Sequence, residues 1–116
     1  MTVFGHPLDP ELASGPEFHI WLDLDAEPPR IGVAGELDLA TCASLRDAFM
    51  LACEKSPDRI VLDCRHLVFI GSIGIREIAR ALTRINYIEI HSPSPAVRNV
   101  LEMIELGPRV TIVEQI

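Results

Sequence analysis

The chain has 116 residues and a formal net charge of -7. A chain of this length buries one hydrophobic core but not two, and 48% hydrophobic with 23% charged residues is the composition of an ordinary globular domain rather than a disordered one. The acidic balance argues against nucleic acid and anionic lipid as general partners, because both carry negative charge.

Residues 1–16 contain three prolines and two glycines, a composition that disfavours helix and strand alike. We therefore expect a flexible N-terminal tail over 1–16 and one folded domain over 17–116. No apolar run approaches the ~18 to 20 residues needed to cross a bilayer, and the N-terminus lacks the basic and apolar regions of a secretion signal. The sequence predicts a cytoplasmic protein.

The folded part begins with a predicted hairpin. Apolar residues alternate with polar ones over 18–24, which is the pattern of a strand with one buried face. A second strand is predicted over 30–35, after a loop that contains Pro28 and Pro29, so the two strands should pair antiparallel. Trp21 falls on the nominally exposed face of the first strand, and we expect it to be exposed.

Helices and strands alternate after the hairpin. Apolar residues at helical spacing predict helices over 40–55 and from Ser72 to about residue 86. The apolar run 60–62 predicts a strand buried on both faces, and 87–91 a further strand. Ser94 and Pro95 begin a third helix, because serine caps and proline is tolerated at the first helical position. A short strand over 110–113 follows.

The order β-β-α-β-α-β-α-β predicts an α/β fold with right-handed crossovers. We expect a mixed, mainly parallel sheet of four to five strands packed against three to four helices. The three cysteines, Cys42, Cys53 and Cys64, show no C-x-x-C spacing, so neither a disulfide framework nor a zinc cluster is predicted. Cys42 and Cys53 should be reduced thiols in the core. No metal site and no cofactor is indicated.

Ser72 is the main candidate functional residue, because it leads from a strand into a helix within Gly71-Ser72-Ile73-Gly74. A hydroxyl in that position can cap the helix, act as a nucleophile or accept a phosphate. A phosphate at a helix N-terminus meets unpaired backbone N–H groups and the positive end of the helix dipole, so the folded domain should tolerate it. The cap and the phosphate both remain open from the residues alone.

Asp63 and His66 raise the alternative of a hydrolase with Ser72 as its nucleophile. The nucleophile elbow requires G-x-S-x-G, however, and Ile70 stands where the first glycine belongs. We expect His66 to be an exposed loop residue instead.

Arg76, Arg80 and Arg84 recur every four residues and form a basic stripe on the helix that Ser72 begins. The simpler interpretation of such a stripe is a solvated helix face. Arg76 lies one turn beyond Ser72, so it is also positioned to pair with a phosphate there.

Three segments resemble the STAS domain family: GELDLAT at 35–41, a strand with Leu-Asp at 62–63 that runs into FIGSIGI at 69–75, and SPSPAVR at 92–98. The resemblance covers about residues 17–113 and is closest to the bacterial anti-sigma factor antagonists. It implies a non-enzymatic signalling module that binds a partner acting as both serine kinase and anti-sigma factor, with Ser72 as the phosphorylation site.

The resemblance also implies a partner-binding surface around Ser72. We assign to this surface six residues: Asp38, Thr41, Gly71, Ile73, Gly74 and Arg76. The family usually shows Asp-Ser-Ser-Gly where this chain has Gly71-Ser72-Ile73-Gly74, an exchange that suits constitutive docking. STAS domains also serve as accessory subunits that pack on the ATPase of ABC-type lipid transporters, and as scaffold components of sensory assemblies.

Overall fold

The computed structural model of the chain describes residues 2–4 and 18–114. The elements follow one another in the order β1 (Thr2–Phe4), β2 (His19–Asp23), β3 (Arg30–Leu37), α1 (Cys42–Cys53), β4 (Arg59–Ile70), α2 (Ser72–Ala81), β5 (Tyr87–His91), α3 (Pro95–Met103) and β6 (Val110–Val113).

The described strands form one sheet in the order β1-β2-β3-β4-β5-β6. β2 and β3 pair antiparallel, and every other neighbouring pair is parallel. The predicted hairpin and the mixed, mainly parallel sheet are thereby confirmed. The strand order equals the chain order, so each crossover moves one position in the same direction.

The N-terminal segment departs from the expected loose tail. Thr2–Phe4 form β1, which pairs with Ile20, Trp21 and Leu22 of β2 and adds a sixth strand to the four or five predicted. A β-branched and aromatic triplet is favoured in a strand once an edge is available to pair with. The expectation is therefore wrong over 2–4, and residues 5–17 lie outside the described part of the chain.

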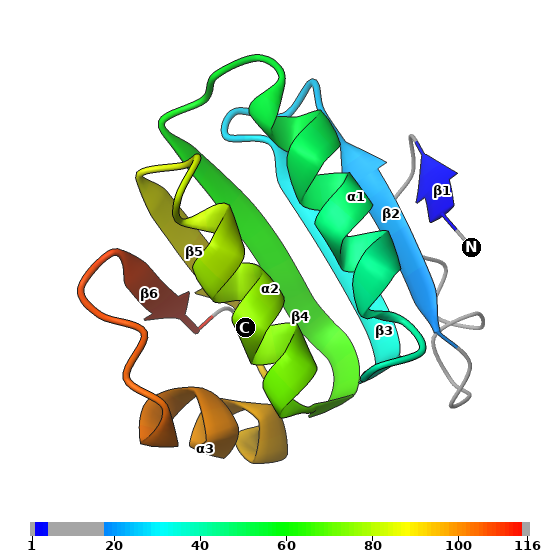
Figure 1. The fold of residues 1–116 in the computed structure, drawn as a ribbon, viewed down its shortest axis with the longest axis vertical. Helices are drawn as coiled ribbons and strands as arrows, with labels where there is room; N and C mark the ends of the chain where they lie inside the picture. The colour runs from blue at the N-terminus through cyan, green and yellow to red at the C-terminus, as the bar shows by residue number, and fades with distance from the viewer. Residues whose placement is uncertain (1, 5–17, 115–116) are drawn as a thin grey trace.

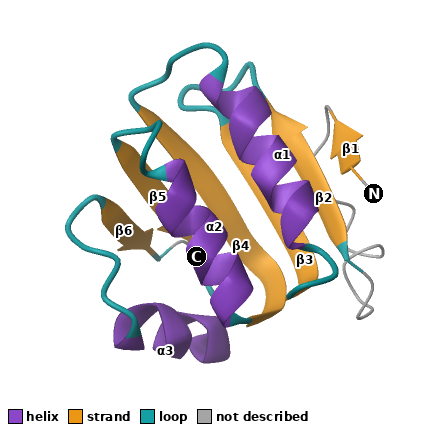
Figure 2. Ribbon diagram, in the orientation of Figure 1, coloured by secondary structure: helices purple, strands orange, loops and turns teal. Residues whose placement is uncertain are grey.

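The helices lie over one face of the sheet. Right-handed crossovers that all move in one direction place successive helices on the same side. Figure 1 shows α1 and α2 side by side across this face, with α3 beside the end of α2 that begins at Ser72, and Figure 2 separates the two layers by colour. Core side chains from both layers are fully buried, among them Ile20, Val33, Leu45, Leu62, Ile78 and Ile90.

β4 is much longer than the predicted strand over 60–62. It runs from Arg59 to Ile70, and its pairing with β3 continues through two register shifts. Polar residues in the middle of β4 interrupt its apolar pattern, so the pattern alone does not predict a strand there. The backbone N–H and C=O groups of these residues form hydrogen bonds in the ladder to β3. His66 lies in this strand opposite Ala34, so the expected loop position for His66 is wrong.

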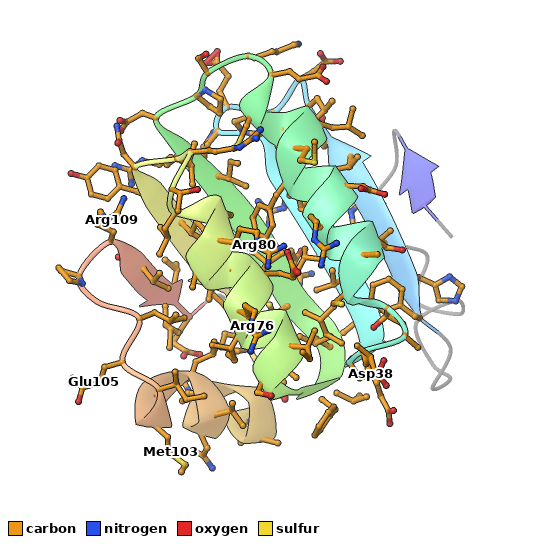
Figure 3. The ribbon with its side chains drawn as sticks, viewed as in Figure 1. Asp38, Arg76, Arg80, Met103, Glu105 and Arg109 are labelled. Carbon is orange, nitrogen blue, oxygen red and sulfur yellow. The ribbon has the colours of Figure 1, made fainter. Side chains whose placement is uncertain are left out.

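α2 ends at Ala81 rather than near residue 86, and a basic side chain closes that end. Arg109 Nη1 donates to the carbonyl oxygens of Leu82 at 3.0 Å and Ile85 at 3.3 Å. Leu82 is the C-cap of α2 and Ile85 belongs to the turn that follows, so the cation lies near the negative end of the helix dipole. Arg109 thus ties the loop before β6 to α2 (Figure 3).

The predicted start of the third helix is confirmed. The Ser94 hydroxyl accepts from the backbone N–H of Val97 at 3.3 Å, and Pro95 occupies the first helical position. The three cysteines are free thiols, as expected. Cys42 and Cys64 are buried, and burial raises the pKa of the Cys64 thiol, whereas Cys53 is only half-buried.

Trp21 is buried, with 4% of its surface exposed, so the expected exposed position is wrong. Its ring lies over Gly32, the residue paired with it on β3. A Cβ atom at Gly32 would lie 1.9 Å from Trp21 Cζ2, which no side chain can occupy. The absence of a side chain at Gly32 therefore makes the room that buries the indole.

We predict that Gly32→Ala destabilises the protein by about 1 to 3 kcal/mol, because the added methyl group overpacks the site under the indole. The free energy of unfolding, measured by urea titration, tests this. In a Trp21→Leu background the same Gly32 substitution should cost much less. An equal cost in both backgrounds would show that the Trp21–Gly32 contact is not its cause.

Candidate functional site

Asp38 and Ser72 lie at the same edge of the sheet because β3 and β4 run parallel. Leu37, the last residue of β3, is paired with Ile70, the last residue of β4. The backbone N–H of Gly71 donates to the Leu37 carbonyl oxygen at 2.9 Å, which extends the ladder by one bond. The loops that follow the two strands therefore leave the sheet side by side, at the carboxyl edge where α/β folds usually place their sites.

Asp38 organises the loop between β3 and α1. Its Oδ1 accepts from the backbone N–H of Ala40 at 3.0 Å, and its backbone carbonyl accepts from the N–H of Cys42, the first residue of α1, at 2.9 Å. Thr41 closes the loop from the other side: its hydroxyl oxygen accepts from the Asp38 N–H at 2.9 Å and donates to the Glu36 carbonyl at 2.8 Å. Both side chains hold a fixed turn next to Ser72.

Ser72 is exposed and is the first residue of α2. The cap position belongs to Gly71, which has no side chain to donate or accept, and no side-chain bond caps this helix. The interpretation of Ser72 as a helix cap is therefore wrong, because the hydroxyl lies one residue too far along the chain. Its oxygen makes no hydrogen bond within the described part of the chain.

The residues on either side of Ser72 divide between surface and core. Gly71 and Ile73 are half-buried, and the Phe69 ring lies against Gly71, so that a Cβ there would be 3.4 Å from Phe69 Cε2. Gly74 is buried, and a Cβ there would approach side-chain atoms of Ile70 and Leu37 to 2.9 Å. Gly74 brings α2 close to the sheet, so any effect it has on docking is indirect.

Two large apolar side chains near Ser72 are exposed and were not singled out from the sequence. Leu39 follows Asp38 in the loop and is 77% exposed, and Phe69 near the end of β4 is 48% exposed. Their exposure depends on where the strands end, and no local pattern marks it. Leu39, Phe69 and Ile73 give this edge of the sheet an apolar character around the free hydroxyl.

Arg76 is exposed and lies one helical turn beyond Ser72, on the same face of α2. Its guanidinium has no carboxylate partner among the described residues. Arg80 and Arg84 are also exposed, in agreement with a solvated basic stripe. Figure 3 shows Asp38, Arg76 and Arg80 along this side of the molecule, with Arg76 nearer to the start of α2 than Arg80.

The family profile described as "Mlab, STAS domain" matches residues 20–114. The chain belongs to the STAS domain family. The matched region spans the described fold from β2 to the residue after β6, including the Asp38 loop and the start of α2. No curated protein sequence matches the chain significantly.

Solved structures of anti-sigma factor antagonists share this STAS fold. One from Mycobacterium paratuberculosis is 20% identical, with a TM-score of 0.74 over 85% of this chain and 87% of its own. Unphosphorylated SpoIIAA is 22% identical, with a TM-score of 0.68 over 81% of this chain and 87% of its own. The phosphorylated form of SpoIIAA, a Bacillus cell fate determinant, is 20% identical, with a TM-score of 0.59 over 81% and 90%.

The hydrolase alternative finds no support in the geometry of this STAS domain. The buried Asp63 carboxylate accepts from the backbone N–H of Arg65 at 3.0 Å and from the Arg30 guanidinium at 3.5 Å, so it pairs with arginines rather than a histidine. No described contact joins His66 to Ser72. Among the described residues no three metal-ligating side chains gather, and no described helix is long and apolar enough to span a bilayer.

An ion pair between a partly exposed arginine and a buried glutamate, which the sequence analysis did not predict, joins α1 and α2. The Glu77 carboxylate on α2 is 2% exposed and receives two nitrogens of Arg46 on α1, with Nη2 at 2.6 Å from Oε2 and Nε at 3.1 Å from Oε1. The hydrogen bonds from Arg46 hold the pKa of Glu77 below its usual value against the opposing effect of burial. The two residues lie on separate helices, 31 positions apart in the sequence, so no local motif predicts the pair.

The lowered pKa of Glu77 predicts acid-sensitive stability. A carboxylate with a lower pKa in the folded than in the unfolded state stabilises the fold above its unfolded pKa of about 4.3 and loses that contribution as pH falls through the folded value. Glu77→Gln should therefore be less stable than the wild type at neutral pH, and the difference should shrink on acidification. Urea titrations from about pH 7 to about pH 3 test this.

Glu54→Gln provides the matched control, because Glu54 is exposed and has no ion pair among the described residues. It should follow the wild-type stability curve across this range. A Glu77→Gln curve parallel to that of the wild type would show that the carboxylate does not contribute through its ionisation.

Proposed function

We propose that this STAS domain is a non-enzymatic signalling module that docks an anti-sigma factor/serine kinase through the surface around Ser72, and that phosphorylation of Ser72 switches the docking. The observation that supports this proposal most directly is that the Ser72 hydroxyl is accessible and unbonded among the described residues. Ser72 Oγ is exposed and free of hydrogen bonds within the described structure, at the start of a helix and beside the ordered Asp38 loop. A kinase partner with ATP implies a cytoplasmic protein.

The site can accept a phosphate without loss of the fold. The first turn of α2 offers backbone N–H groups without intrahelical partners, and the helix dipole favours negative charge there. Arg76, one turn further on, supplies a cation without a carboxylate partner. The likeness of this chain to both the phosphorylated and the unphosphorylated SpoIIAA structures supports an architecture that persists in both states.

A phosphate would nevertheless change the docking surface. It adds roughly -1.5 to -2 charge close to the Asp38 loop and to the exposed apolar side chains of Leu39 and Phe69. Apolar side chains at the centre of an interface contribute most when water is excluded, and a dianion beside them keeps water in place. Modification of one hydroxyl would therefore weaken binding while the core remains intact.

The first test is phosphorylation itself. Wild-type protein incubated with ATP and the anti-sigma kinase encoded by its own genome should gain one phosphate, measured by intact-mass spectrometry, and Ser72→Ala should gain none. Ser56→Ala is the control, because Ser56 is an exposed serine outside this surface and its loss should leave the modification unchanged. A phosphate that persists in Ser72→Ala would move the switch to another residue.

The second test separates charge from shape. Ser72→Asp should lower the affinity for the kinase partner about tenfold, which corresponds to about 1.4 kcal/mol, because it places a carboxylate beside the Asp38 loop. The thermal melting temperature should remain nearly unchanged, since Ser72 is exposed and makes no hydrogen bond in the described structure. Isothermal titration calorimetry gives the affinity.

Ser72→Asn is the matched control, with nearly the same size as aspartate and no charge. Its free energy of binding to the kinase partner should lie within a few tenths of a kcal/mol of the wild-type value, as is usual for substitutions at exposed sites. Equal affinities for the Asp and Asn variants would remove electrostatics from the switch.

A second candidate function follows from the same surface. Gly71 and Ile73 replace the carboxylate and the second hydroxyl usual in the family, and together with Phe69 they leave an apolar patch suited to permanent docking. The corresponding role is an accessory subunit that packs on the ATPase of an ABC-type lipid transporter. Stable co-purification with such an ATPase, with no phosphorylation by any anti-sigma kinase of the same genome, would favour this role.

A further inference from the structure

We propose that the groove between α1 and α2 is a second docking surface, which binds an acidic amphipathic helix of another protein. Phe49, Met50 and Cys53 of α1 face Ala81 of α2 across this groove, and its walls are mainly apolar. Met50, which lines the groove, is 48% exposed. The groove is therefore an apolar depression that the described chain leaves uncovered.

The size of the groove decides between a small molecule and a protein. Its volume is about 210 Å³, below the ~300 to 1,000 Å³ of sites that enclose a drug-sized ligand. A depression of this size suits one or two apolar side chains of a larger partner. Interfaces commonly use such pockets to seat their central anchor residues.

The rim of the groove sets the charge of its occupant. Three arginines, Arg46, Arg80 and Arg84, surround it against a single carboxylate, Glu77, which leaves a surplus of two positive charges. Arg46 is committed to Glu77, and Arg80 lies 3.7 Å from the same carboxylate. Arg84 has no carboxylate partner among the described residues, so its guanidinium is available to an incoming anion.

This basic rim stands out on a chain whose net charge is -7. A local positive patch on an acidic protein steers acidic partners to one place and repels them elsewhere. The chemistry that fits the groove is thus apolar side chains flanked by Asp or Glu. A helix supplies that pattern on one face, with apolar anchors at every third or fourth position, and a furrow between two neighbouring helices is a usual seat for it.

The groove is separate from the Ser72 surface. Ser72 is the first residue of α2, whereas Arg80 and Ala81 lie at its end. At ~1.5 Å of rise per residue, the groove residues of α2 begin about 7 to 8 Å from Ser72 at Glu77 and reach about 12 Å at Arg80. Ser72 does not line the groove, and binding in the groove requires no phosphorylation.

A designed peptide tests the proposal on the full chain. The probe is a fluorescein-labelled helix of about 15 residues, long enough to populate the helical state, with leucine along one face and glutamate on both flanks. A second peptide carries lysine in place of each glutamate. Fluorescence anisotropy should show saturable binding of the acidic peptide, weakened by salt, and at least tenfold weaker binding of the lysine peptide.

Two charge reversals on α2 test whether the acidic peptide binds in the groove. Arg84→Glu should weaken the acidic peptide about tenfold, because Arg84 lines the groove and can pair with its glutamates. Arg76→Glu makes the same change of net charge one helical turn before Arg80, at a residue that does not line the groove, and should weaken the peptide clearly less, by about two- to threefold. The Cys53 thiol should also react more slowly with a thiol reagent when the acidic peptide is bound.

The opposite results would overturn the proposal. Equal losses in Arg84→Glu and Arg76→Glu would mean general charge attraction rather than the groove. No saturable binding of the acidic peptide, or binding only to vesicles of phosphatidylglycerol, would exclude the peptide-helix occupant. Loss of Ser72 phosphorylation in the kinase assay would leave this inference untouched, because neither peptide measurement depends on it.

Discussion

The parallel ladder between β3 and β4 is the constraint on which the rest of the structure depends. It pairs Leu37 with Ile70, and the Gly71 N–H extends it by one hydrogen bond to the Leu37 carbonyl. Because both strands end at the same level, the Asp38 loop and the first turn of α2 must leave the sheet as neighbours. The buried, obligatory nature of these main-chain bonds makes the arrangement rigid, so a chemical change at Ser72 is presented on a fixed frame.

α2 connects this edge to the groove on the helical face. Gly74 lets its first turn approach the sheet closely, and the ion pair between Arg46 and Glu77 fixes its flank against α1. Beyond its far end Arg109 binds the carbonyl oxygens of Leu82 and Ile85. A helix held at three places behaves as one rigid element, so Ser72 and the groove residues keep a fixed arrangement along it.

The charge distribution differs between the two surfaces. Around Ser72 the exposed groups are the Asp38 loop, the apolar side chains of Leu39 and Phe69 and the single cation of Arg76, and further along α2 the rim of the groove carries three arginines. A phosphate at Ser72 would add negative charge to the first surface, and its effect on the far rim at Arg84 would be weakened by screening over about 10 Å. The proposed phosphorylation site and the proposed docking groove thus lie at different places along α2.

The sequence by itself determined the fold class, the hairpin, the start of α3 and the place of Ser72 between strand and helix, because these rest on local periodicity, proline and glycine positions and short motifs. Tertiary structure decided the rest. The length of β4 depends on its ladder to β3, the burial of Trp21 on the empty space above Gly32, and the Arg46–Glu77 pair on the contact of two helices. Ser72 lost its expected capping role because Gly71 took that position, and a shift of one residue at a helix start depends on how closely the helix packs on the sheet, which local preference alone cannot specify.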